Sequence, residues 1–276
     1  FAGTNSGTGV ITLAATISGG GQEYSEPVTL AGDTTLMSLD GIDFLFPVDG
    51  AGNLSLDASA DGVRFLASVG SNVPLASLTI TGNVRTLVSG DIMTTGDQSF
   101  ETPIITNAGG SVVNMVSSAG TLAFGSTIDN GATPADTLLT DSDGETTFGG
   151  AIGGANPLAS LDVNPAEDLL IANDITVLGD INLTISDFGN LTIQSPAVLT
   201  SGNLNSVNLN IADNIDIQVG STINTSTLNV IADPPVTDSD PGTGSTILVN
   251  GTINATNVTN VTGGDDSDTI SITPQS

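Results

Sequence analysis

Five aspartates are close enough together in the sequence to suggest metal binding. Asp265, Asp266 and Asp268 follow a pair of glycines, and Asp141 and Asp143 flank a serine just before a turn glycine. Calcium is a hard cation that takes about six to eight oxygen ligands, and closely spaced carboxylates supply them. These five residues are therefore the candidate metal ligands, with Ca²⁺ as the candidate cofactor.

Each acidic cluster also has an interpretation without a metal. The segment around Asp141 lacks the later glutamate of an EF-hand loop, and its counterpart in an earlier internal repeat keeps only Asp61 before Gly62. A third acidic pair, Asp238 and Asp240, lies in a proline-rich stretch that predicts a solvated loop. Acidic turns between strands would account for all three clusters.

Side chains for most catalytic chemistry are missing from the chain. It has no His, Cys or Lys, and its only cations are Arg64 and Arg85. An imidazole base and a Ser-His pair are therefore excluded, and the two arginines leave little with which to stabilise an oxyanion. A pair of carboxylates that hydrolyses a glycosidic bond stays open as an alternative. We expect the protein not to be an enzyme.

The charge balance narrows the possible partners. Thirty acidic residues against two basic ones give a formal net charge of −28. Such a chain repels nucleic acid phosphates and anionic lipids, and it attracts cations. No apolar run approaches the ~20 residues of a membrane-spanning helix. Hydrophobic residues still make up 38% of the chain, which argues against disorder throughout.

Apolar residues alternate with polar ones along much of the sequence. Residues 54–57, 78–81, 181–185 and 207–211 show this period of two, which is typical of half-buried strands. Asp-Gly and Asn-Gly pairs separate many of these runs and predict turns. Apolar residues at helical spacing are almost absent, so the pattern predicts an all-β fold.

Two segments of the chain recur downstream. Residues 73–78 (VPLASL) return as residues 156–161 (NPLASL), an offset of 83. Residues 22–27 (QEYSEP) are echoed by residues 98–103 (QSFETP), an offset of 76. Recurrence of this kind is typical of a repeat architecture, in which each unit buries its apolar face against the next.

Shorter offsets in the C-terminal half indicate the size of one unit. Residues 211–213 (IAD) recur at 231–233, and residues 220–223 (GSTI) recur at 244–247, offsets of 20 and 24. One coil of a parallel β-helix has this length. We therefore predict a β-helix, or β-solenoid, built from degenerate repeats. With ~20 residues per coil and ~4.8 Å between stacked strands, it would make about 13 turns and a rod about 65 Å long.

A change of composition near residue 180 divides the predicted rod. Residues 1–180 carry longer, insertion-rich repeats, and residues 181–276 continue the solenoid as coils rich in Asn and Thr. Eight Asn-x-Ser/Thr triplets are glycosylation motifs in a secreted eukaryotic protein, but stacked Asn ladders are the role we predict for many of them. The triplets begin at Asn53, Asn182, Asn190, Asn224, Asn250, Asn254, Asn257 and Asn260.

Some of these segments resemble a known family. Residues 26–36 (EPVTLAGDTTL) and 148–161 are similar to repeats of very large bacterial exoproteins in the style of filamentous haemagglutinin. Residues 263–270 (GGDDSDTI) resemble a degenerate glycine- and aspartate-rich calcium repeat. The resemblance covers roughly residues 20–165 and that tail. It implies a right-handed β-helix that is secreted or displayed at the cell surface, and it carries over no catalytic residues.

The expected function is therefore that of an extracellular or cell-surface β-solenoid with a structural or adhesive role. Open coil ends would allow copies to stack head-to-tail into a filament. The expected partners are other copies of the chain and host or matrix carbohydrate, with no nucleic acid and no insertion into a membrane. The alternative is a β-helix protein that binds or hydrolyses carbohydrate.

Overall fold

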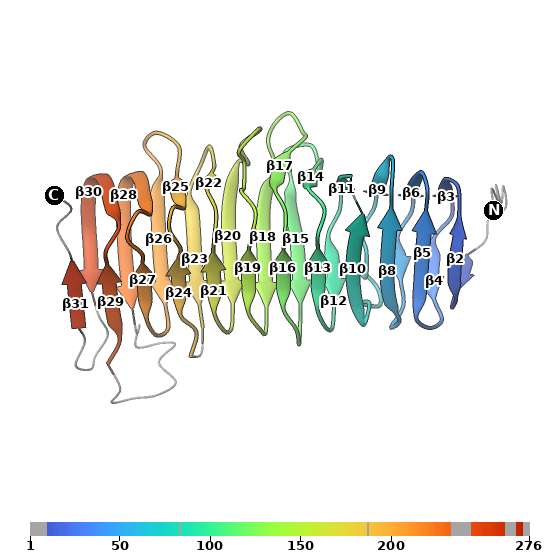
Figure 1. Ribbon diagram of the computed structural model, residues 1–276, viewed down its shortest axis with the longest axis horizontal. Coiled ribbons are helices and arrows are strands. Elements are labelled where there is room, and N and C mark those ends of the chain that lie inside the picture. Colours follow the sequence, from blue (N-terminus) through green and yellow to red (C-terminus); the bar gives the residue numbers. More distant parts are fainter. Residues whose placement is uncertain (1–9, 83, 187, 233–243, 263–268, 273–276) are drawn as a thin grey trace.

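The chain folds into a continuous stack of β-coils. The computed structural model describes residues 10–82, 84–186, 188–232, 244–262 and 269–272. Thirty-one strands and no helix are found among these residues. Every strand pair is parallel, and the first and last strands lie at opposite ends of the stack (Figure 1). The predicted all-β solenoid is confirmed.

Three faces surround the core, and each coil passes through them in the same order. The first face is a single sheet of twelve strands. Its strands are β2 (Thr16–Gly19), β5 (Thr34–Ser38), β8 (Asn53–Ala58), β10 (Ser77–Gly82), β13 (Gln98–Phe100), β16 (Leu122–Phe124), β19 (Thr146–Phe148), β21 (Leu169–Ile171), β24 (Leu191–Ile193), β27 (Ile215–Ile217), β29 (Thr246–Val249) and β31 (Thr269–Ile272).

The second face begins as a six-stranded sheet and continues through a bridge at Ile152 into β22. Its strands are β3 (Gln22–Tyr24), β6 (Gly41–Phe44), β9 (Gly62–Phe65), β11 (Thr86–Val88), β14 (Ile104–Thr106), β17 (Ile128–Asn130), β22 (Ile175–Thr176), β25 (Val198–Thr200) and the first part of β28 (Thr222–Ala232).

The third face consists of a three-stranded sheet and a longer sheet, and a bridge at Val69 connects the two. Its strands are β1 (Ile11–Leu13), β4 (Val28–Leu30), β7 (Val48–Asp49), β12 (Ile92–Thr94), β15 (Val112–Ser117), β18 (Thr137–Ser142), β20 (Ser160–Pro165), β23 (Ile181–Ile185), β26 (Ser206–Ile211) and the second part of β28. Strand β28 and its neighbour β30 (Thr252–Thr262) are long enough to run round the corner between the second and third faces.

The coil lengths agree with the sequence offsets of 20 and 24, but most coils are longer than the ~20 residues from which 13 turns were predicted. Residues paired along the first face are 19 to 24 positions apart, with a single step of 32 between Ile215 and Ile247. The twelve strands therefore replace the expected 13 turns. The shortest steps lie at the N-terminal end, so coil length does not distinguish the two halves, and the boundary near residue 180 stays a prediction from composition. Pairing continues past it, from Leu161 to Ile181.

Alternation along each strand sends one set of side chains into a single apolar core. Leu54 and Leu56 of β8 are buried while Ser55 between them faces outward. Because equivalent positions stack coil on coil, aromatic rings also stack. Tyr24, Phe44 and Phe65 form one stack in the second face. A second stack, Phe100, Phe124 and Phe148, lies in the first face.

The two aromatic stacks show that the sequence repeat changes face. Tyr24, Phe44 and Phe65 are 20 and 21 residues apart, and their counterparts in the other stack are 24 residues apart, so the offset grows from 76 to 83. The first copy places these rings in the second face, and the second copy places them in the first face. Similar local sequence thus forms the same structure on two different sides of the rod.

The corner that follows each stack is preserved. Gly70 and Gly153 have φ angles of 72° and 68°, a conformation that glycine adopts without steric cost. A Cβ on Gly70 would approach the Met93 carbonyl oxygen to 2.1 Å, and one on Gly153 would approach the Thr176 carbonyl oxygen to 2.0 Å. Both glycines are required because a neighbouring coil passes directly against them.

One buried polar contact differs between the copies. Gln22 donates from Nε2 to the Met37 carbonyl at 2.8 Å, and Gln98 makes the same contact with the Val116 carbonyl at 2.8 Å. Tyr24 donates its hydroxyl to Oε1 of Gln22 at 2.9 Å, and burial raises the pKa of Tyr24 to about 12, which keeps that proton in place. Phe100 has no hydroxyl, and Oε1 of Gln98 is buried without a hydrogen-bond partner among the described residues.

The Tyr24→Phe variant should leave Oε1 of Gln22 without a donor, as Oε1 of Gln98 already is among the described residues of the second copy. We expect it to lower the free energy of unfolding by about 1 kcal/mol, because Oε1 of Gln22 loses its donor. Urea denaturation of both proteins measures the difference. A Tyr24→Phe protein as stable as the wild type would show that the hydroxyl contributes nothing.

Candidate functional site

The structure describes only part of the predicted calcium site. Asp265, Asp266 and Asp268 lie outside the described residues, as do Asp238 and Asp240. Asp141, at the end of β18, and Asp143 are exposed on either side of a buried serine. Partial burial, reinforced by the charge of Asp143, raises the pKa of Asp141.

These two carboxylates supply at most four of the oxygens that calcium takes. Within the described ranges, no group of three or more Asp, Glu, His or Cys side chains is placed to hold a metal ion. Calcium binding at Asp141 and Asp143 stays a prediction, and it needs ligands from outside that pair.

Many other aspartates have a structural role that the sequence reasoning missed. Within the described ranges, at least nine of them accept hydrogen bonds from backbone N–H groups of an adjacent coil, at distances between 2.6 and 3.2 Å. A corner interrupts the strand ladder and leaves donors without partners, which a carboxylate can satisfy. The nine are Asp33, Asp49, Asp91, Asp97, Asp129, Asp136, Asp168, Asp174 and Asp180. Much of the acidic composition therefore supports the corners of the coil.

Asp49 illustrates the electrostatic effect of such a contact. Desolvation is the largest influence on the pKa of Asp49 and raises it, but three hydrogen bonds from Asn72 and Val73 together outweigh it. The net result is a pKa below the ordinary value for aspartate. A lowered pKa in the folded state stabilises the protein above the unfolded pKa, and the contribution is lost as pH falls through the folded pKa.

The Asp49→Asn variant should therefore be less stable than the wild type at pH 7. The deficit should begin to shrink as the pH falls below about 4, where the carboxylate of the unfolded wild type becomes protonated, and should continue to shrink until the folded carboxylate is protonated as well. Urea midpoints measured between pH 7 and pH 2.5 test this. The outward-facing Asp57, whose side chain accepts no backbone hydrogen bond from the described residues, provides the matched control Asp57→Asn. A deficit independent of pH would contradict the assignment.

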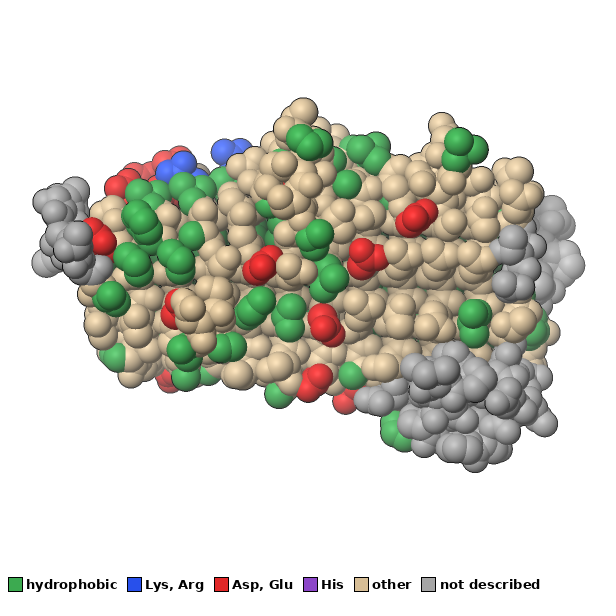
Figure 2. All heavy atoms as spheres, turned by 180° about the vertical axis from the view of Figure 1, so that it is seen from behind, with side chains coloured by type: hydrophobic (Ala, Val, Ile, Leu, Met, Phe, Trp, Pro, Cys, Tyr) green, Lys and Arg blue, Asp and Glu red, His purple; other side chains and the backbone are tan. Residues whose placement is uncertain are grey.

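Asparagines form ladders along the outside of the rod, and the triplet residues Asn182, Asn190, Asn224 and Asn254 are among their members. Asn182 donates to Asp162, Asn208 donates to Oδ1 of Asn182 at 2.7 Å, and Asn229 donates to Oδ1 of Asn208 at 2.6 Å. Each amide in such a row satisfies the next. Figure 2 shows regular rows of tan atoms over the C-terminal half, whereas hydrophobic side chains gather over the N-terminal half.

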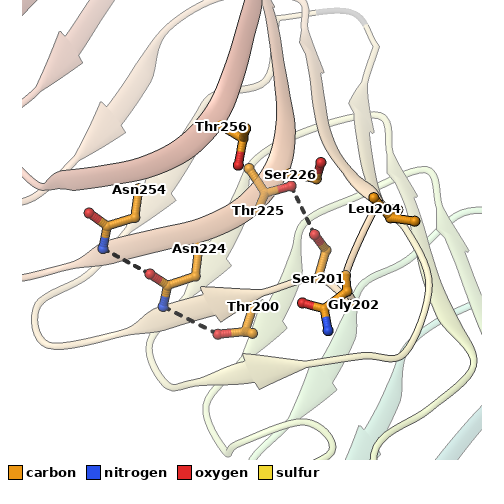
Figure 3. Close-up of a pocket in the computed structure, with 10 residues that line it drawn as sticks. Thr200, Ser201, Gly202, Leu204, Asn224, Thr225, Ser226, Asn254 and Thr256 are labelled. Carbon is orange, nitrogen blue, oxygen red and sulfur yellow. Dashed lines mark hydrogen bonds between the residues drawn. The ribbon is translucent and has the colours of Figure 1, made fainter.

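One groove opens where the second and third faces meet on the C-terminal coils (Figure 3). Its volume is about 510 Å³, and three successive coils build it through β25, β28 and β30. None of its lining residues carries a charge. They are Thr200, Ser201, Gly202, Asn203, Leu204, Asn224, Thr225, Ser226, Asn254 and Thr256.

Two rows of hydrogen bonds hold the groove wall. Asn254 donates to Oδ1 of Asn224 at 2.9 Å, and Asn224 donates to Oγ1 of Thr200 at 3.4 Å (Figure 3). Beside this row, Ser201 donates to Oγ1 of Thr225 at 2.8 Å. The wall is therefore a fixed lattice of hydroxyl and amide groups with the spacing of the stacked strands, ~4.8 Å.

Leu204 is the unusual residue of the groove. It has a φ of 71°, the only positive φ of a non-glycine residue in the described part of the chain, and this conformation costs on the order of 1 kcal/mol for a side chain such as leucine. Its side chain is 91% exposed. A hydrogen bond from the N–H of Asn205 to the Gly202 carbonyl at 3.1 Å closes the turn that contains Leu204, and this turn holds an apolar group in solvent at the edge of a polar groove.

The groove offers binding groups and lacks catalytic ones. Its lining residues include no carboxyl, imidazole or thiol group, so the paired carboxylates of a glycoside hydrolase are missing from it. The sequence drew attention to Asn224 and Asn254 only as members of triplets. Nothing in the sequence marked Leu204, because its significance depends on its backbone conformation and exposure.

Comparisons with known proteins identified no relative of this chain. Among the described residues, no helix is long and apolar enough to cross a membrane. No family model matches the chain, and searches of curated proteins and of solved structures found no match.

Proposed function

We propose that the chain is a rod-shaped structural and adhesive element of a secreted or cell-surface protein. The observation that carries this proposal is the unbroken core, which runs through all the described coils beneath three faces of parallel strands. A solenoid of this kind holds its surface groups at fixed spacing along a stiff axis. The resemblance to filamentous-haemagglutinin-like exoproteins supports the same role.

End-to-end assembly is the finer part of the proposal. In a parallel stack each coil pairs its backbone with the coils on both sides, so an end coil offers the same donors and acceptors to another copy. Such a contact is heterologous and does not close, which leads to filaments. Calcium bound to acidic side chains would reduce the repulsion between copies that each carry a net charge of −28.

Electron microscopy of the purified chain, in calcium and then in a chelator, tests the proposal. We expect rods, with about 53 Å for the eleven steps between twelve strands, or filaments of such rods. Filaments that dissociate in the chelator would support calcium bridging, and filaments indifferent to it would remove that part. Compact round particles would overturn the rod itself.

A proline variant separates pairing at the rod end from other modes of association. Ala15, just before β2, and Gly19, at its end, accept hydrogen bonds at their carbonyls from Thr35 and Leu39 on the β5 side. Because strand residues alternate, the N–H of Ser18 points to the opposite edge. Ser18→Pro should leave the rod intact and prevent filament formation. Ser55→Pro, in the middle of the first face, is the control that should damage the coils themselves. Filaments that persist in Ser18→Pro would exclude assembly through this edge.

A further inference from the structure

We propose that the polar groove on the C-terminal coils binds a neutral oligosaccharide. The inference rests on the proposed adhesive role of the rod, and it specifies the class of ligand that one adhesive site would bind. Four features of the groove support it: its lack of charge, its unused polar groups, its periodic wall and the exposed leucine at its edge.

The absence of charged side chains from the groove lining indicates which class of ligand it would bind. The groove is lined only by Thr, Ser, Gly, Asn and Leu, on a chain with a net charge of −28. An anionic polysaccharide would meet repulsion and find no cation to pair with, since Arg64 and Arg85 lie elsewhere on the chain. A cation would find no carboxylate. A polyhydroxylated neutral ligand matches the donors and acceptors that remain.

Several polar groups of the groove are available for such a ligand. The side chains of Asn203, Ser226 and Thr256 make no hydrogen bond with other described residues, whereas Asn224 and Thr225 are held in the rows of the wall. The side chains of Asn224 and Thr225 are already held by hydrogen bonds, so they lose little conformational entropy when a ligand binds. The unused groups provide bonds to the hydroxyls of a sugar.

The shape of the groove favours an extended chain over a single compact molecule. Equivalent groups repeat from coil to coil at ~4.8 Å, a spacing close to the length of one pyranose unit. Gly202 lets the preceding coil pack closely beneath the groove, because a Cβ there would approach the Leu178 carbonyl oxygen to 1.8 Å. Successive sugar units could therefore contact successive coils with the same set of groups.

Leu204 supplies the apolar part of the site. One face of a pyranose ring consists largely of C–H groups, and burying them against an apolar side chain is favourable. The positive φ of Leu204 and its 91% exposure show that the fold holds this side chain outward at a cost in stability. Strained backbone of this kind is found more often at ligand-binding sites than elsewhere, and here it lies at the edge of the groove.

The test measures binding and stability on the same variants. Titration calorimetry would compare neutral tri- to hexasaccharides (xylo-, cello-, manno- and chito-oligosaccharides) with the anionic trigalacturonate. We expect the wild type to bind at least one neutral series and not trigalacturonate. Leu204→Gly should weaken that binding at least tenfold while stability stays equal or rises, because glycine adopts the positive φ without strain.

Two further variants show whether the groove is the site. Asn224→Ala breaks the amide row of the wall and should also weaken binding at least tenfold. Its matched control, Asn208→Ala, breaks the amide row of the third face outside the groove and should leave binding unchanged. Leu39→Gly, at an exposed leucine near the other end of the rod, controls for the loss of a surface leucine.

The outcomes distinguish this inference from the proposed function. Rods in the microscope that bind none of the neutral oligosaccharides, or whose binding survives both Leu204→Gly and Asn224→Ala, overturn the groove assignment and leave the rod standing. Trigalacturonate binding as tight as the neutral series also overturns it. Compact particles in the microscope overturn the rod, whatever the calorimetry shows.

Discussion

Phe124→Ala should lower the free energy of unfolding by about 3–5 kcal/mol, which is the usual cost of removing a buried aromatic ring. Phe124 is 1% exposed and lies between two parallel rings, with centroids 5.4 Å from Phe100 and 5.1 Å from Phe148. Its removal leaves a cavity and ends both ring contacts. Because the neighbouring rings belong to adjacent coils, the cavity separates two halves of the same stack.

Hydrogen exchange would show how far this effect spreads. A solenoid is stabilised by interactions between nearest coils, so we expect protection to fall most in β13, β16 and β19 and least in distant coils such as that of β27. Phe188→Ala is the matched control, because Phe188 is 61% exposed and its removal should change stability by less than about 0.5 kcal/mol. Equal losses of stability in the two variants would contradict the described packing.

Asp136→Ala should have the second-largest effect, about 2–3 kcal/mol, because it leaves two backbone donors without an acceptor. The Asp136 side chain accepts from the N–H of Ala108 at 2.7 Å and from that of Gly110 at 2.6 Å. Unlike the exposed corner aspartates, Asp136 is completely buried. Its own N–H donates to Oδ1 of Asn130 in the same loop at 3.1 Å. Asp136 is thus fixed within its loop while its side chain joins that loop to the adjacent coil.

Urea denaturation measures the loss, and exchange of the Ala108 and Gly110 amides locates it. Asp136→Asn should recover only part of the stability, because one of its two groups is a donor that faces another donor. Asp174→Ala is the matched control. Asp174 accepts one bond, from the N–H of Val198, at an exposed corner, so its loss should cost about 1 kcal/mol or less. A similar cost for both alanine variants would show that burial adds nothing.

The Phe124 variant probes the inward-facing core that the sequence predicted, and the Asp136 variant probes a contact that it did not. The alternation at residues 54–57 and 207–211 correctly indicated which side chains point inward, because neighbouring residues of a strand lie on opposite sides. The stacked asparagines were also anticipated, since repeats of one coil length place equivalent residues together. The expected number of turns was too high, because corners of variable length enter each coil.

The aspartates show where sequence reasoning failed. The clusters at 141–143 and 265–268 attracted attention because their carboxylates are adjacent in the chain. Asp136 and Asp49 act on residues 23 to 28 positions away, and no local pattern reports such a contact. Their role depends on which corner donor lies opposite, and that is known only once the coil lengths are known.

The sequence by itself determined that this chain forms strands with one apolar side, and that its segments repeat closely enough to stack. Both properties are local, or depend on similarity between segments. Tertiary structure alone decided on which face each copy of a repeat lies, which aspartates satisfy corner N–H groups, and where a groove opens beside Leu204. The physical reason is that these features depend on the register between coils, which is set by backbone pairing between residues 19 to 32 positions apart on the first face and not by any local pattern.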